Sequence, residues 1–171
     1  MMANLVKAVA IVVTMTNTMT ISDIAKPTIK TEVYNYNNPV IEIPKINLKK
    51  EVYPNDKTKN NVDKNIEVIE GSKMPNEKHS NFILASHSGS SSIAYFKHLD
   101  QVTYNDIVYI YYQNIKYRYI INDIYDVAKT GYIEIKRLQN KNAITLVTCK
   151  KNSNLQTVYI GYLEITEKLH N

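Results

Sequence analysis

Short apolar runs separated by polar turns fill the chain from residue 40 to residue 165. These runs are rich in Ile, Val, Tyr and Thr, residues that suit the pleated, half-buried surface of a strand. The clearest of them span residues 82–85, 107–112, 116–127, 144–148 and 157–165. About eight such runs with little helical periodicity predict a mainly β fold, either a closed barrel or a sandwich.

Two local patterns modify this strand prediction. Residues 40–48 alternate between apolar and polar positions around Pro44, which cannot donate a hydrogen bond to a neighbouring strand. This segment is therefore an edge strand or a break between two strands. Residues 93–99 carry apolar side chains three positions apart, which predicts one or two helical turns that the serines at 90–92 can cap.

The first 21 residues differ in character from the rest of the chain. Lys7 precedes a short apolar stretch at 8–13, as in an export signal or a membrane anchor, although a spanning helix needs about 20 apolar residues. A loosely docked N-terminal helix is the alternative. We predict a signal or anchor segment at 1–21, a linker at 22–39, one domain at 40–168 and a tail at 169–171.

Charge and composition argue against several functions. The chain has 21 Lys and Arg against 16 Asp and Glu, a formal net charge of +5, but its only arginines are Arg118 and Arg137. Nucleic-acid readers favour Arg for contacts to bases and phosphates, and the chain has no basic stripe interleaved with aromatic residues, so we expect no nucleic-acid partner. The four glycines form no phosphate-binding loop, and the histidines and the single cysteine lack the spacing of metal ligands. We therefore expect no cofactor and no metal.

Two side chains suited to catalysis stand at the ends of apolar runs. Cys149 closes the run at 144–148 and precedes a polar loop, so its thiol is held by a rigid strand yet open to a substrate. His87 follows the run at 82–85, and both strand ends can meet at one mouth of a barrel. The alternatives are a cysteine buried as a small apolar side chain and a histidine that only caps a strand by hydrogen bonds.

Three stretches resemble the sortases, the cysteine transpeptidases of Gram-positive cell surfaces. Residues 145–149 (TLVTC) resemble the family's TLxTC signature, and residues 85–87 (ASH) resemble the A-[GS]-H pattern that carries its catalytic histidine. Residues 43–48 (IPKINL) resemble the IPxIxL first strand. The resemblance covers residues 40–165 and implies the eight-stranded, closed sortase-type β-barrel with one or two short helices.

The resemblance implies an activity and a location. Cys149 would attack the scissile carbonyl of an LPxTG-like sorting motif near the C-terminus of a surface protein, and His87 would protonate the departing amine and deprotonate the incoming one. The acceptor amine would belong to a lipid-linked peptidoglycan precursor or to a protein lysine. Thr148, Ser86 and Ser88 would lie against the peptide, and the protein would be exported or anchored at the outer face of the cell membrane.

The sequence departs from the family at one functional position. Gln156 stands where sortases have an arginine on the strand after the cysteine loop, and no arginine follows Cys149. Gln156 can donate two hydrogen bonds but carries no charge. We expect Gln156 to replace the arginine. Alternatively, Lys150, Lys151 or Arg118 supplies the charge from another direction, or the enzyme is slow or inactive. A barrel that binds surface peptides without processing them, or a cysteine hydrolase, would follow from the same residues.

Overall fold

The computed structural model describes residues 36–169. The predicted signal or anchor segment, most of the predicted linker and the last two residues of the predicted tail lie outside the described residues. Within residues 36–169, no helix is long and apolar enough to cross a membrane.

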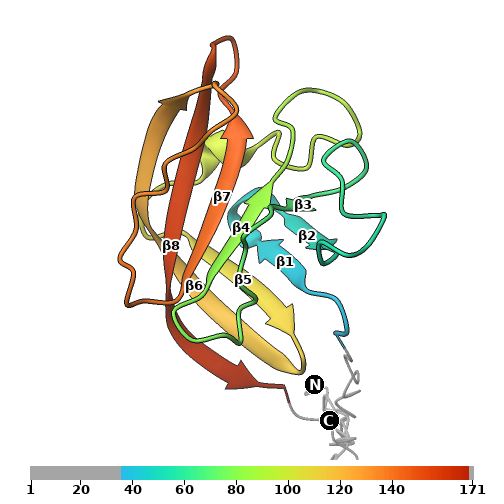
Figure 1. The fold of residues 1–171 in the computed structure, drawn as a ribbon, viewed down its shortest axis with the longest axis vertical. Helices are drawn as coiled ribbons and strands as arrows, with labels where there is room; N and C mark the ends of the chain where they lie inside the picture. The colour runs from blue at the N-terminus through green and yellow to red at the C-terminus, as the bar shows by residue number, and fades with distance from the viewer. Residues whose placement is uncertain (1–35, 170–171) are drawn as a thin grey trace, which may run out of the picture. The chain divides into compact units, whose positions relative to one another are not determined.

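Eight strands form a single sheet in the order β2-β1-β5-β6-β8-β7-β4-β3 (Figure 1). Their bounds are β1 Val40–Ile43, β2 Leu48–Glu51, β3 Glu67–Val68, β4 Asn81–Ala85, β5 Ile107–Tyr112, β6 Ile115–Ala128, β7 Ala143–Cys149 and β8 Leu155–Lys168. The sheet curls, and an isolated bridge between Tyr53 and Glu67 links the chain next to β2 with the other edge strand, β3. The predicted mainly β, eight-stranded fold is confirmed, with its edges joined at one bridge instead of a continuous ladder.

Pro44 separates the first two strands. It begins a short 3₁₀ helix, η2 (Pro44–Ile46), which ends at Asn47 in the left-handed conformation with a φ of 50°. The chain then reverses, so that β1 and β2 pair antiparallel. Of the two alternatives for residues 40–48, the structure therefore shows the break between two strands.

The segment predicted to hold helical turns at 93–99 is built differently. It consists of turns, and its 3₁₀ helix, η3 (Leu99–Gln101), begins only at the end of the segment. The backbone N–H of Phe96 donates to the carbonyl oxygen of His87 at 3.1 Å, instead of to a carbonyl one helical turn earlier. Because Phe96 and Leu99 are both fully buried, the spacing of three serves the core without a helix.

β5 and β6 form an antiparallel hairpin. Gln113 and Asn114 form its two-residue turn with positive φ angles of 49° and 59°, which match the twist of the flanking strands. β6 then pairs along its length with β8, the last strand.

β7 is buried on both faces, which explains why apolar residues and buried threonines follow one another along it without a charged side chain. Ile144 and Leu146 face the main core inside the curled sheet, together with Phe82 and Leu84 of β4. On the other face lies a second apolar cluster, formed by Ala143, Val147, Val158 and Ile160, against which Ile133 and Ile135 of the connection between β6 and β7 pack. We call this set the outer apolar cluster.

β4 and β7 are the one parallel pair among the ladders of the described residues, and their arrows point the same way in Figure 1. Parallel strands end at the same edge of a sheet. The residues that follow Ala85 therefore lie beside the C-terminal end of β7.

Gly161 allows β8 to approach its neighbours closely. A Cβ atom there would lie 3.1 Å from the carbonyl oxygen of Ile120 and 3.1 Å from Cγ2 of Ile144. We expect Gly161→Val to lower the free energy of unfolding by about 1–3 kcal/mol, because the added atoms overpack the contact between β6, β7 and β8. Urea unfolding followed by circular dichroism measures the change.

The matched control is Thr166→Val, which changes an exposed position of the same strand without a change in branching. It should leave the unfolding midpoint within the error of the measurement. Equal midpoints for the two variants would contradict the close approach at Gly161.

Candidate active site

The parallel pairing of β4 and β7 brings His87 and Cys149 to the same place. Ala85 pairs with Val147, so two residues further on His87 lies level with Cys149. Both side chains border a cavity of about 600 Å³, together with the serine-rich stretch 88–91. The structure therefore brings together the two residues that the sequence singles out as nucleophile and acid–base group.

A buried hydrogen bond fixes the spacing of these two strand ends. The Oγ1 of Thr148 donates to the carbonyl oxygen of Ser86 at 2.8 Å, and the backbone N–H of Ser86 donates to the carbonyl oxygen of Val147 at 3.3 Å. The residues before His87 and before Cys149 are thus tied directly to each other. Thr148 and Ser86 are nearly fully buried, which shields this contact from water.

Cys149 also borders a second, smaller cavity of about 330 Å³ at the inner side of the sheet. Thr148, Thr157 and Tyr159 line this cavity, since they alternate along β7 and β8 with the residues of the outer face. Ser88 borders both cavities, whereas the buried Ser86 borders neither. Of the three predicted peptide contacts, Thr148 and Ser88 therefore line the site, and Ser86 lies behind it.

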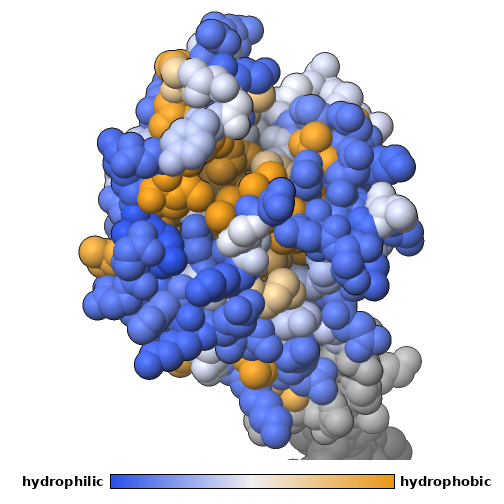
Figure 2. All heavy atoms as spheres, viewed as in Figure 1, coloured by the Kyte–Doolittle hydropathy of each residue, from blue (hydrophilic) through white to orange (hydrophobic). Residues whose placement is uncertain are grey.

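Gln156 lies opposite Cys149 in the register of β7 and β8. Both residues alternate with Val147 and Val158, so they belong to the face that carries the outer apolar cluster. Figure 2 shows apolar side chains gathered in a hollow over the upper parts of β4, β7 and β8. The thiol and the amide thus stand on the face that carries this buried cluster and the partly exposed apolar side chains packed against it.

Neither arginine lies near the thiol. Arg118 forms an ion pair with Glu164 near the start of β6, whereas the residue of β6 level with Cys149 and Gln156 is Val127, about 30 Å further along the strand. Arg137 donates to the carbonyl oxygens of Leu138, Lys141 and His79, on the approach to the start of β7. The structure therefore rules out the account in which Arg118 supplies the missing charge.

Two lysines directly after Cys149 hold the loop that follows it. Lys150 forms an ion pair with Asp126 of β6, and Lys151 forms one with Asp100 of η3 at 2.9 Å. Asp126 also accepts a hydrogen bond from Thr157 at 2.8 Å. The contact with Lys150 and then the bond from Thr157 lower the pKa of Asp126 below its usual range. Both lysines line the two cavities at Cys149, but their charges are already paired.

Tyr159 contributes a neutral hydroxyl to the smaller cavity. Burial, followed by the nearby carboxylates of Asp100 and Asp126, raises the pKa of Tyr159 to about 12. At neutral pH its phenol therefore keeps its proton, and the inner wall of the cavity offers hydroxyl groups from Thr148, Thr157 and Tyr159.

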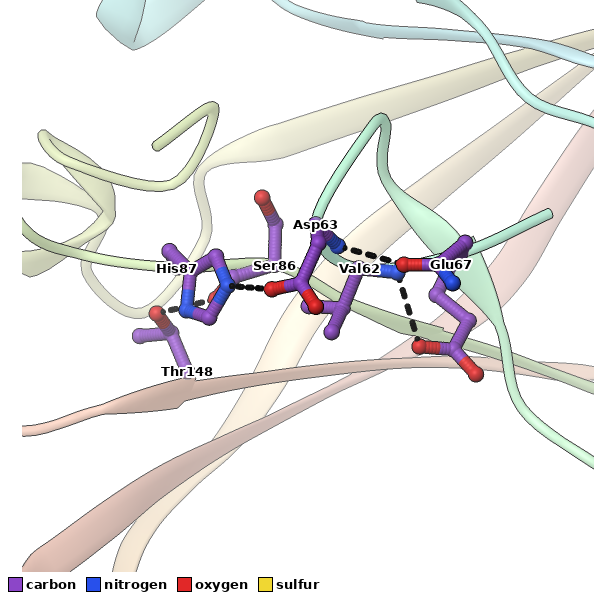
Figure 3. Close-up of polar contacts among 7 residues, drawn as sticks. Val62, Asp63, Glu67, Ser86, His87 and Thr148 are labelled. Carbon is purple, nitrogen blue, oxygen red and sulfur yellow. Dashed lines mark hydrogen bonds and ion pairs between the residues drawn. The ribbon is translucent and has the colours of Figure 1, made fainter. Parts of the chain in front are cut away.

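The sequence pattern gave no sign of Asp63. Its Oδ1 atom lies 3.1 Å from Nε2 of His87, reaching the ring from the loop that precedes β3 (Figure 3). Asp63 falls in a polar segment without periodicity, so only the path of that loop in space reveals the contact. Within residues 36–169, no group of three or more His, Cys, Asp or Glu is arranged to hold a metal ion.

Comparison with known proteins agrees with this geometry. The family model described as the sortase domain matches residues 41–163. A search of curated protein sequences gave no significant match. The chain is similar to the crystal structure of sortase C1 from Streptococcus agalactiae, with 27% identity, a TM-score of 0.66, and coverage of 75% of this chain and 68% of that one.

Two further structures share the fold. Sortase C from Streptococcus pneumoniae matches with a TM-score of 0.66 and 19% identity over 76% of this chain and 70% of that one. Sortase A from Listeria monocytogenes matches with a TM-score of 0.64 and 22% identity over 80% of this chain and 93% of that one. Because the family model covers well over half of the sequence, the chain belongs to the sortase family.

Proposed function

We propose that the protein is a cysteine transpeptidase that cleaves an LPxTG-like sorting motif and transfers the acyl group to an amine. The observation that carries the proposal is the meeting of His87 and Cys149 at the adjoining ends of β4 and β7, both open to one cavity. Family membership supports the same activity, since sortases are generally cysteine transpeptidases of the cell surface.

The proposed reaction has two acyl-transfer steps. In the first, the sulfur of Cys149 attacks the carbonyl carbon, the C–N bond breaks, and His87 gives a proton to the departing amine. A thioester on Cys149 remains. In the second, an acceptor amine attacks that thioester, His87 takes the amine's proton, and the thiolate of Cys149 leaves. One amide is exchanged for another, so no cofactor is needed.

The partly exposed side chains that pack against the outer apolar cluster support a peptide substrate with apolar side chains. Val147 and Val158 are themselves buried, but Ala85, Val127 and Ile133 cover them and remain partly exposed on the face that carries the thiol. Side chains such as the Leu and Pro of a sorting motif would gain roughly 25 cal/mol for each Å² of apolar surface that they bury there. The scissile bond would then lie at Cys149.

Gln156 is our candidate for the donor that stabilises the oxyanion. It stands directly across from Cys149, and within the described residues its side chain makes no hydrogen bond. Its amide N–H groups are therefore free to donate to the tetrahedral intermediate. Lys150 and Lys151 are weaker candidates, because each would first have to leave the carboxylate with which it is paired.

The proposal extends to partners and location. The donor substrate would be a surface protein with a C-terminal sorting motif, and the acceptor would be a lipid-linked peptidoglycan precursor or a protein lysine. The enzyme would act at the outer face of the cell membrane of a Gram-positive bacterium, held there by residues 1–21 or exported with their help.

The test is the identity of the product. The full chain is incubated with an LPxTG-like peptide library and a short peptide that has a free N-terminal amine, and the products are identified by mass spectrometry. We expect a new amide between the acyl part of one library peptide and the added amine. Cys149→Ala should abolish its formation, because the thioester cannot form.

Free acid alone, in the presence of excess amine, would contradict transfer and indicate a hydrolase. Tight binding of a library peptide without any cleavage would indicate a barrel that binds surface peptides without processing them. Each result replaces the proposed reaction with a defined alternative.

Gln156→Ala tests the proposed oxyanion donor. Loss of one such donor costs about 10²–10³ in turnover, so we expect turnover to fall by about a hundredfold while the circular dichroism spectrum stays unchanged. Gln156→Arg should retain or increase turnover, since a charged donor is about twice as strong as a neutral one. Unchanged turnover in Gln156→Ala would show that another group holds the oxyanion.

A further inference from the structure

We infer that Asp63 is the positioning residue of His87, fixing the orientation and the tautomer of its ring for proton transfer. The inference rests on the proposed function, in which His87 exchanges protons with the two amines. It adds a carboxylate from the loop between β2 and β3 to the pair formed by His87 and Cys149.

The contact defines which ring nitrogen holds the proton. Oδ1 of Asp63 lies 3.1 Å from Nε2 of His87. An ionised carboxylate can only accept hydrogen bonds, so Nε2 must be the donor and must carry a proton. In the neutral ring Nδ1 then holds the free electron pair, and Figure 3 shows this second nitrogen facing away from Asp63. Nδ1 is therefore the atom left to exchange protons with substrate.

The loop that carries Asp63 is held at several points. The side chain of Asn60 both accepts from the N–H of Val68 at 2.6 Å and donates to its carbonyl oxygen at 2.9 Å. Asn65 is buried and donates to the carbonyl oxygen of Glu51 at 2.9 Å. These bonds fix the loop to β3 and to the end of β2 on both sides of Asp63.

Two further bonds shape the turn at Asp63 itself. The backbone N–H of Val62 donates to Oε2 of Glu67 at 3.0 Å, a contact visible in Figure 3. The backbone N–H of Asp63 donates to Oδ1 of Asn61 at 2.8 Å. The carboxylate of Asp63 thus contacts His87 from a turn that these hydrogen bonds hold in place.

The backbone of His87 is fixed, but its ring needs a partner. The carbonyl oxygen of His87 accepts from the N–H of the buried Phe96 at 3.1 Å. Within the described residues, Asp63 is the one hydrogen-bond partner of the ring. Without Asp63 the ring could therefore turn about its side-chain bonds and could hold its proton on either nitrogen.

Because the side chains of His87 and Asp63 are both exposed, their contact can orient the ring without contributing much to the stability of the fold. The side chain of His87 is 41% exposed and that of Asp63 is 75% exposed. Exposed pairs of this kind contribute little to stability, so removal of the carboxylate should leave the fold intact. Asp63 also borders neither cavity at Cys149, so peptide binding should be unaffected. The effect of a substitution should be confined to the rate of acyl transfer.

The kinetic test compares Asp63→Asn, Asp63→Ala and Asp63→Glu in the full chain. We expect kcat to fall about tenfold in the Asn and Ala variants with KM unchanged, because a misoriented ring or the wrong tautomer cannot transfer the proton. Asp63→Glu keeps an acceptor that can only receive hydrogen bonds and should restore kcat to within about threefold of the wild type.

Asp56→Asn is the matched control. Asp56 is an exposed aspartate of the same loop whose carboxylate pairs with its neighbour Lys57. This variant removes the same charge from the same loop without touching His87, so its kcat should equal that of the wild type. Equal values of kcat for Asp63→Asn and Asp56→Asn would overturn the inference.

A second readout does not depend on activity. Long-range ¹H–¹⁵N correlation of the imidazole ring at neutral pH reports which nitrogen carries the proton. We expect the proton of neutral His87 on Nε2 in the wild type and on both nitrogens in Asp63→Ala. An unchanged tautomer in Asp63→Ala would overturn the role of Asp63, and a wild type that forms no acyl-enzyme would instead overturn the proposed transpeptidase.

Discussion

The parallel pairing of β4 with β7 is the constraint on which the site depends. The two strands share the main core through Phe82, Leu84, Ile144 and Leu146, so their relative register is set by buried apolar contacts. A slip of either strand by one residue would turn the core side chains of that strand to the wrong face of the sheet. The same register places His87 level with Cys149, and the bond from Thr148 to Ser86 ties the last residues before the site together. The geometry of the candidate site is in this sense a consequence of core packing.

Around this pair the structure separates apolar from polar surroundings. The outer face of β7 and β8 carries the buried outer apolar cluster and the partly exposed apolar side chains that pack against it, whereas the inner face carries the hydroxyls of Thr148, Thr157 and Tyr159. Lys150 and Lys151 directly follow Cys149, and the side chain of each forms an ion pair with a carboxylate of a different element. The loop after Cys149 is thus fixed by ion pairs, whereas the side chain of Gln156, beside the thiol, makes no hydrogen bond within residues 36–169.

Most of the strands and the residues of the candidate site could be predicted from local sequence pattern. The features that the sequence did not predict have a common cause. Cys149 and His87 follow short apolar runs with β-branched or aromatic residues, and such residues favour strands. Gln156 follows from counting along the next strand. The segment at 93–99 has helical spacing but folds as turns, with a 3₁₀ helix only from Leu99 onward, and its Phe96 N–H bonds to the carbonyl oxygen of His87. Asp63 and the packing of Ile133 and Ile135 on β7 and β8 depend on the paths of irregular loops. Such contacts between residues distant in sequence leave no periodic signal.

The central claim is that Cys149 and His87 act together as nucleophile and acid–base group. The most direct measurement is the intact mass of the protein after incubation with the LPxTG-like peptide library in the absence of an amine, followed by acid quenching. The account predicts a mass gain equal to the acyl part of one peptide, located on Cys149, absent in Cys149→Ala and much reduced in His87→Ala. A folded protein whose thiol reacts with a small alkylating agent but gains no acyl group from any peptide would contradict it.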